Sequence, residues 1–253
     1  MLVGVALPAE NQSGKPAVNA AVLLDGGRLL LEQHKRLLPF YDVFDEQRYF
    51  APSKPQEIVE IEGLRLAITI CEDAWNDKNF WPRRLYSVDP VEELMRQKPA
   101  VLINLSSSPF WHGKRALRRQ MLSAIAARNG VPVLLVNQVG GNDSLIFDGS
   151  SLALNARGGL IAQAASFEED LIVVDTFNAP LVATPQDDDT EAAFRALVLH
   201  ARLCAQVRFQ KGIGGTERGY RFSACGSDCY RSSGGGERSR HRYAQPLLLF
   251  GLY

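Results

Sequence analysis

Cys71 is the residue in this chain with the clearest capacity for chemistry, because of what precedes and follows it. The run Leu64–Ile70 is mostly aliphatic and predicts a buried strand, and the pair Glu72-Asp73 is typical of a helix first turn. A thiol at such a junction faces backbone N–H groups and a positive helix dipole. Both favour the thiolate, so the position suits a nucleophile. The alternative is a small buried side chain without chemistry.

Lys35 is a second candidate for the same site. It follows the apolar run Arg28–Leu31 and precedes an aromatic, proline-containing segment that ends in Glu46-Gln47-Arg48-Tyr49-Phe50. Ordering such a loop costs conformational entropy, so we expect it to pack over another part of the protein. A solvated lysine at the end of a strand is the alternative.

Short apolar runs and turn signals predict the helices, strands and turns that position Cys71 and Lys35. Hairpin turns are predicted at residues 25–27 and 62–63, and a further turn at 157–159. Helices are predicted over 91–98, 114–129 and 190–207, and the first two each precede a buried strand. This alternation predicts an α/β fold with a mixed sheet. The predicted strands are residues 2–7, 20–24, 28–31, 58–61, 64–70, 101–105, 131–137, 152–154 and 171–175.

Four segments in this order and at these spacings resemble the nitrilase superfamily, and more closely the glutaminase domain of glutamine-dependent NAD(+) synthetases. They are Lys35, the loop ending in residues 46–50, Cys71 within Ile70–Asp73, and Asn104–Phe110. The similarity runs from residue 1 to about residue 200 and includes residues 147–151 and 167–171. The resemblance implies an α-β-β-α sandwich, incomplete here because the first strand and its helix have no counterpart.

The resemblance also implies roles for particular residues in the hydrolysis of an amide. Cys71 would attack the carboxamide of glutamine, Lys35 would stabilise the oxyanion, and Glu46 would orient Lys35. The family's residues for the amino-acid end of glutamine match Tyr41, Ser108 and Lys114, and its oxyanion-hole amide matches the N–H of Glu72. For Lys114, a surface position at a helix start is the alternative.

One member of the family's Glu-Lys-Cys triad has no match. The general-base glutamate lies upstream of the lysine, and here only Glu10, Asp25 and Glu32 precede Lys35, none of them in the family's motif. No residue is assigned to this role. Two alternatives therefore stand beside a glutaminase: an inactive fragment or subunit-binding remnant, and a relative that acts on another amide or on a nitrile.

The resemblance divides the chain into three parts and names the partners of the first. Residues 1–185 form a partial glutaminase domain, 186–207 a linker and helix, and 208–253 a tail that is disordered or translated out of frame. Amide hydrolysis needs no cofactor, whereas the family's synthetase domain uses ATP and Mg²⁺ to amidate deamido-NAD. We expect that domain to be absent here, since residues 233–239 lack the strand that a phosphate-binding loop requires. The full-length family is expected to form homo-oligomers.

Composition excludes several other classes. The formal net charge is zero, so nothing global indicates nucleic acid or an anionic membrane, and the apolar runs are too short to span a bilayer. The start lacks the features of a signal peptide, which predicts a cytoplasmic protein.

Residues 201–253 carry nine Lys or Arg against three Asp or Glu. Cys225, Cys229 and His241 in that tail make only a weak metal-site candidate, and no metal is assigned.

Overall fold

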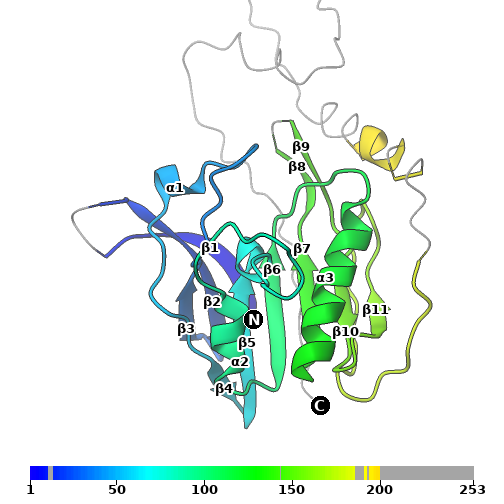
Figure 1. The fold of residues 1–253 in the computed structure, drawn as a ribbon, viewed down its shortest axis with the longest axis horizontal. Coiled ribbons are helices and arrows are strands. Elements are labelled where there is room, and N and C mark those ends of the chain that lie inside the picture. Colours follow the sequence, from blue (N-terminus) through cyan, green and yellow to red (C-terminus); the bar gives the residue numbers. More distant parts are fainter. Residues whose placement is uncertain (11–13, 143, 186–190, 193, 200–253) are drawn as a thin grey trace, which may run out of the picture.

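The computed structural model describes residues 1–10, 14–142, 144–185, 191–192 and 194–199 (Figure 1). The predicted tail at 208–253 and its metal-site candidate lie outside these residues. So does most of the predicted linker and third helix, although residues 191–192 and 194–199 are helical as expected. No helix in the described part of the chain is long and apolar enough to cross a membrane.

Two sheets carry most of the structure. A three-stranded antiparallel sheet has the order β1-β2-β3, and a six-stranded mixed sheet has the order β11-β10-β7-β6-β5-β4. Within the larger sheet, β5, β6 and β7 are parallel, and the flanking pairs are antiparallel. The strands of these two sheets are β1 (Leu2–Pro8), β2 (Ala17–Asp25), β3 (Arg28–His34), β4 (Val59–Ile61), β5 (Leu64–Ile70), β6 (Val101–Ser106), β7 (Val133–Asn137), β10 (Leu152–Leu154) and β11 (Leu160–Gln163).

The sheets and helices stack as layers with apolar clusters buried between them. α2 (Pro90–Met95) and α3 (Lys114–Asn129) cover one face of the six-stranded sheet, where Leu94, Leu122 and Ile125 are buried against it (Figure 1). The three-stranded sheet packs on the opposite face, and its Ala21 contacts Ile68 and Ile70. The helix-sheet-sheet order agrees with the predicted sandwich.

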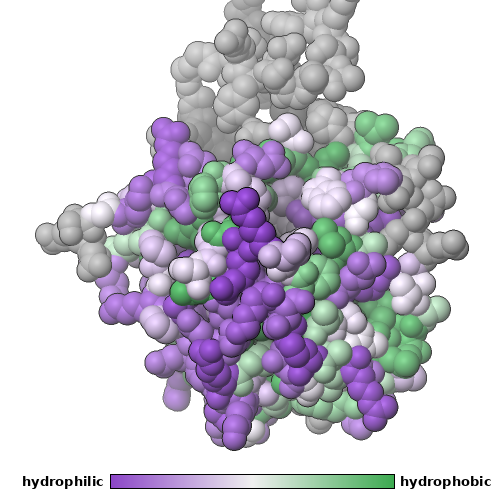
Figure 2. Space-filling model, in the orientation of Figure 1, coloured by the Kyte–Doolittle hydropathy of each residue, from purple (hydrophilic) through white to green (hydrophobic). Residues whose placement is uncertain are grey.

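The helix ends follow the signals in the sequence. Asp89 caps α2, its Oδ1 accepting the N–H of Glu92 at 3.0 Å, and Pro90 occupies the first helical position. Gly130 ends α3 with φ of 65°, a left-handed conformation that favours glycine. Figure 2 shows mainly hydrophilic surface where α2 lies in Figure 1, as expected for the outer side of an amphipathic helix.

The sequence interpretation was wrong or incomplete in a few elements. Residues 171–175 form no strand; Leu171 and Val173 are exposed, and the carboxylate of Asp170 accepts the N–H groups of Ala165 and Leu171 instead. Four short elements were missed because they carry little periodic signal. They are α1 (Glu46–Tyr49), the hairpin β8 (Val139–Asn142) and β9 (Leu145–Asp148), and β11.

Candidate active site

The site lies at the carboxyl ends of the three parallel strands. Cys71 follows β5 directly, Ser106 ends β6 and Asn137 ends β7. The register pairs Thr69 with Asn104 and Ser106 with Asn137, so these strand ends are adjacent. Ligands of open α/β sheets bind outside this edge, because the loops that follow parallel strands converge there.

Cys71 opens a single 3-10 turn, η1 (Cys71–Ala74), with φ of +44°. Left-handed backbone at a non-glycine residue stores strain. Asn104 braces the turn, its Nδ2 donating to Cys71 O at 3.3 Å and to Thr69 Oγ1 at 3.0 Å. The strand-to-helix junction predicted from the sequence is therefore present, but a four-residue turn has a much smaller dipole than the expected helix.

Lys35 is fixed by a carboxylate on α1. Its Nζ donates to Glu46 Oε1 at 2.6 Å, and its side chain is 1% exposed. Asn19 on β2 holds both partners: its carbonyl accepts the N–H of Lys35 at 2.7 Å, and its Nδ2 donates to Glu46 Oε2 at 3.4 Å. The solvated lysine considered as an alternative is thereby excluded.

Charges near the thiol set its protonation. Burial raises the pKa of Cys71 above its ordinary value, and the Lys35 ammonium opposes this only in part. Burial would lower the pKa of Lys35, but Cys71, Glu46 and Asp73 outweigh burial and raise it. Lys35 is therefore charged at neutral pH while Cys71 holds its proton. This corrects the expectation that the junction favours the thiolate.

Tyr41 and Glu72 meet beside the thiol. The Tyr41 hydroxyl lies 2.9 Å from both carboxylate oxygens of Glu72 and donates to them. Burial raises the pKa of Glu72, and the hydrogen bond from Tyr41 partly offsets this. Glu72 therefore acts on the site through its side chain, whereas its N–H as an oxyanion donor stays a prediction.

Lys114 is buried rather than on the surface, which corrects the alternative given above. Its Nζ donates to Pro109 O at 2.9 Å and lies 5.5 Å from the centre of the Trp75 ring. Burial lowers the pKa of Lys114, and the nearby Cys71 opposes this shift. Ser108 is also buried, and its backbone N–H donates to Asn137 Oδ1 at 3.0 Å.

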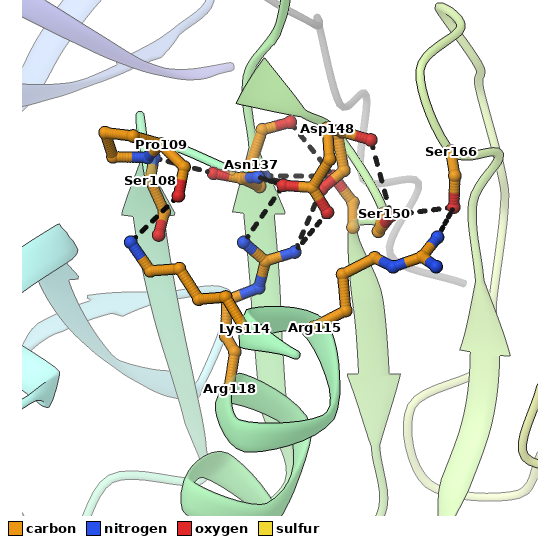
Figure 3. Close-up of polar contacts among 11 residues, drawn as sticks. Ser108, Pro109, Lys114, Arg115, Arg118, Asn137, Asp148, Ser150 and Ser166 are labelled. Carbon is orange, nitrogen blue, oxygen red and sulfur yellow. Dashed lines mark hydrogen bonds and ion pairs between the residues drawn. The ribbon is translucent and has the colours of Figure 1, made fainter. Parts of the chain in front are cut away.

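A buried network that the sequence interpretation missed supports the Ser108 loop (Figure 3). Asn137 Nδ2 donates to Gly149 O at 2.8 Å, next to Asp148. Asp148 forms a two-point ion pair with Arg118 of α3, at 2.9 and 3.3 Å, and both side chains are almost fully buried. Arg118 follows Lys114 by one helical turn and shares its face with the core residues Met121 and Leu122. A charge on the apolar face of a helix is the signal that predicts such a buried partner.

Glu32 and Asp25, two of the acids that precede Lys35, lie in other contacts and do not replace the unmatched base. Glu32 Oε1 pairs with His34 Nε2 at 2.8 Å, and Asp25 lines a cavity of about 290 Å³ between the two sheets. The acidic groups that act most strongly on the Cys71 thiol are Glu72 and Glu46. Among the described residues, no three His, Cys, Asp or Glu side chains are placed to hold a metal ion.

Comparison with known proteins shows the family to which the chain belongs. Residues 1–179 match the carbon-nitrogen hydrolase family. The chain belongs to that family. This carbon-nitrogen hydrolase is 43% identical over 209 residues to the glutamine-dependent NAD(+) synthetase of Synechocystis sp., covering 79% of the chain and 37% of that protein. It is 40% identical over 164 residues to the corresponding Thermotoga maritima protein, covering 64% of the chain and 27% of that protein. The chain thus spans about a third of the length of these relatives.

Solved structures agree with the fold. The glutamine-dependent NAD(+) synthetase of Acinetobacter baumannii, in complex with ADP, matches 81% of this carbon-nitrogen hydrolase and 38% of its own chain, with a TM-score of 0.70 and 31% identity. The carbon-nitrogen hydrolase of Helicobacter pylori matches 66% of the chain and 59% of its own, with a TM-score of 0.55 and 22% identity. The second likeness shows the fold alone, and it supports the sandwich expected from the sequence.

Proposed function

We propose that this chain carries the glutamine-hydrolysing site of a glutamine-dependent NAD(+) synthetase. The observation that carries the proposal is the buried contact between Lys35 and Glu46, whose charges both act on the Cys71 thiol. A cation fixed beside a nucleophile can stabilise the oxyanion that forms on attack at a carbonyl. The similarity of the chain to synthetases of that name indicates glutamine as the substrate.

The reaction follows from these parts. Cys71 Sγ adds to the carboxamide carbon of glutamine while the thiol gives its proton to a base, and Lys35 stabilises the oxyanion. The C–N bond then breaks, the leaving nitrogen takes up that proton and departs as ammonia, and a thioester remains. Water attacks the thioester, giving glutamate and the thiol. Tyr41, Ser108 and Lys114 hold the amino-acid end of glutamine in this scheme, and Lys114 offers a buried positive charge to its α-carboxylate.

Proton removal is the weak step in this chain. The pKa of Cys71 is raised, so attack needs a base, and no residue matches the family's glutamate. We therefore expect slow turnover or none from the chain alone. An inactive fragment or subunit-binding remnant is the second candidate function, and the unmatched general base is the observation behind it.

The proposal extends to partners outside the chain. Ammonia would pass to a synthetase domain that uses ATP and Mg²⁺ to amidate deamido-NAD in an oligomeric assembly. The glutaminase domain would span residues 1–185 and the connecting segment 186–207. The matched residues 1–179 support the first boundary, and the ADP in the Acinetobacter baumannii structure fits the nucleotide chemistry of such a domain.

Two measurements test the site and the turnover separately. A glutamine-mimicking chloromethyl ketone should alkylate Cys71, and added glutamine should protect it; Tyr41→Phe and Lys114→Met should weaken the protection. Alkylation that glutamine does not slow would contradict a glutamine site. Ammonia release from glutamine should be slow, at most slightly above that of Cys71→Ala. Substantial release that depends on Cys71 would refute slow turnover, and Glu46→Gln and Glu72→Gln would then identify the base.

A further inference from the structure

Asp73 stands two residues after Cys71, and both of its carboxylate oxygens bind backbone near the reacting pair. We propose that Asp73 is a positioning residue, which fixes Lys35 and Cys71 relative to each other by holding the backbone of both segments. The inference rests on the proposed function only for the roles of Lys35 and Cys71. Nothing in the sequence distinguishes this carboxylate from an ordinary acid in a helix first turn.

One oxygen holds the segment that carries Lys35. Asp73 Oδ1 accepts the N–H of Leu37 at 2.8 Å and the N–H of Arg36 at 3.1 Å, the two amides that follow the lysine. These contacts fix the direction in which the chain leaves β3. Because Lys35 itself bonds to Asn19 on one side, its backbone is held from both directions.

The other oxygen holds the segment that carries Cys71. Asp73 Oδ2 accepts the N–H of Ile70 at 3.2 Å, immediately before the nucleophile. It also accepts a hydrogen bond from Nε2 of Gln56 at 2.9 Å, and the same amide group donates to His34 O at 3.0 Å. Gln56 thus links the carboxylate to the residue before Lys35. The strained backbone of Cys71 needs such surrounding contacts to persist.

The chemistry of the contacts requires a carboxylate. Asp73 is 1% exposed and faces four donors, two at each oxygen, which only an ionised carboxylate can accept together. Burial raises the pKa of Asp73, and these hydrogen bonds work against that shift. An asparagine keeps one acceptor oxygen but turns an amide NH₂ toward two donors. Asp73→Asn should therefore release one of the two segments.

The two ways in which Asp73 could act shift the pH at which the Cys71 thiol ionises in opposite directions. The charged groups that act most strongly on the Cys71 thiol are Lys35, Lys114, Glu72 and Glu46. If Asp73→Asn lets Lys35 move away from Cys71, the ammonium stabilises the thiolate less, and the thiol ionises at higher pH. If Asp73 acts only through its negative charge, removing that charge makes the thiol ionise at lower pH.

The test is the pH dependence of iodoacetamide alkylation at Cys71, measured on the full chain with Cys204, Cys225 and Cys229 changed to Ser. In Asp73→Asn, we expect the midpoint to move to higher pH and the rate at neutral pH to fall by up to about tenfold, because only the thiolate reacts and its fraction at neutral pH falls as the midpoint rises. The matched control is Asp77→Asn, an equally buried carboxylate that binds Arg128 at 2.5 Å and the N–H of Asn79 at 2.8 Å. Its midpoint should not move.

A double variant shows whether Asp73 acts on the Cys71 thiol through Lys35. With Lys35→Met present, Asp73→Asn should no longer move the midpoint upward, because the cation it positions is gone. A shift that persists without Lys35, a midpoint that moves to lower pH, or an unchanged midpoint overturns the inference. If Asp73→Asn is not folded, as shown by the lack of a cooperative unfolding transition on heating, Gln56→Ala replaces it as the test variant. An upward shift of its alkylation midpoint, smaller than that expected for Asp73→Asn, supports the inference. An unchanged midpoint overturns it. Alkylation needs no glutamine, so loss of the proposed function would leave this result unchanged.

Discussion

Lys35 and Glu46 form an ion pair of 2.6 Å in which the ammonium is 1% exposed and the carboxylate 21% exposed. The cation is therefore desolvated, while its counter-charge reaches the protein surface. A buried ammonium is tolerated only with such a partner, because an unpaired charge is costly in a poorly solvated place. The pair gives Lys35 a fixed location beside Cys71.

Glu46→Gln should destabilise the protein because it removes the anion that is bonded directly to the buried Lys35 ammonium. We expect the free energy of unfolding in urea to fall by about 1–3 kcal/mol, less than for a fully buried pair because Glu46 is partly solvated. The control is Arg96→Ala, which removes an exposed pair with Glu92 on α2 and should change stability little. Equal effects of the two variants would show that the Lys35 pair stabilises the protein no more than an exposed pair does.

Asp148→Asn should have a larger effect, because both partners of the Arg118 pair are almost fully buried. We expect a loss of about 3–5 kcal/mol in the free energy of unfolding. The double variant Arg118→Met, Asp148→Leu should recover part of this loss, since it removes both charges. Failure of the double variant to recover any stability would show that the shape of the network, rather than the unpaired charge, sets the cost.

Local signals in the sequence were sufficient for much of the fold. The helix at 114–129 was predicted with the observed bounds, because its apolar spacing and its final glycine are both local. The turns at 25–27 and 62–63 join β2 to β3 and β4 to β5, as predicted. Lys35, Glu46 and Cys71 were named through the family resemblance, and their catalytic roles stay predictions. The structure places Glu46 against Lys35, and both charges act on the Cys71 thiol.

Relationships between distant segments were not predictable in the same way. Arg118 and Asp148 are 30 residues apart, and neither has a neighbour that reveals the other. Asp73 has the sequence signature of a helix first turn, but its partners come from segments 17 to 37 residues away as well as from Ile70. The protonation of Cys71 depends on burial, which becomes visible only when the loops are packed around it.

Cys71→Gly and Cys71→Ala should reverse the usual order of stability. Glycine in a regular element is normally less stable than alanine by about 0.5–1 kcal/mol, but the φ of +44° at Cys71 penalises any side chain by roughly 1–2 kcal/mol. We therefore expect Cys71→Gly to be at least as stable as Cys71→Ala in urea unfolding. Ala74→Gly, within the same turn, is the control and should lose stability. A glycine variant clearly less stable than the alanine variant would contradict strain at Cys71.

The raised pKa of Cys71 should make stability depend on pH in the alkaline range. The thiol keeps its proton in the folded state above the ordinary value of 9.0, while the unfolded chain releases it. The unfolded state then binds fewer protons, so the free energy of unfolding falls as pH rises. Between about pH 8.5 and 9.7, we expect a loss of about 1 kcal/mol that is absent from Cys71→Ser.

The comparison uses proteins in which Cys204, Cys225 and Cys229 are already Ser, so that one thiol titrates. With the thiol present, Cys71 and Glu46 raise the pKa of Lys35 above 10.5 against burial, and Glu46 remains in the serine protein. Burial also raises the pKa values of Tyr41 and Tyr86, but both tyrosines are present in the two proteins and cancel in the difference. Urea unfolding at several pH values gives the slopes. Identical slopes with and without the thiol would mean that Cys71 ionises as readily in the folded protein as in the unfolded chain, and the case for a protonated nucleophile would fail.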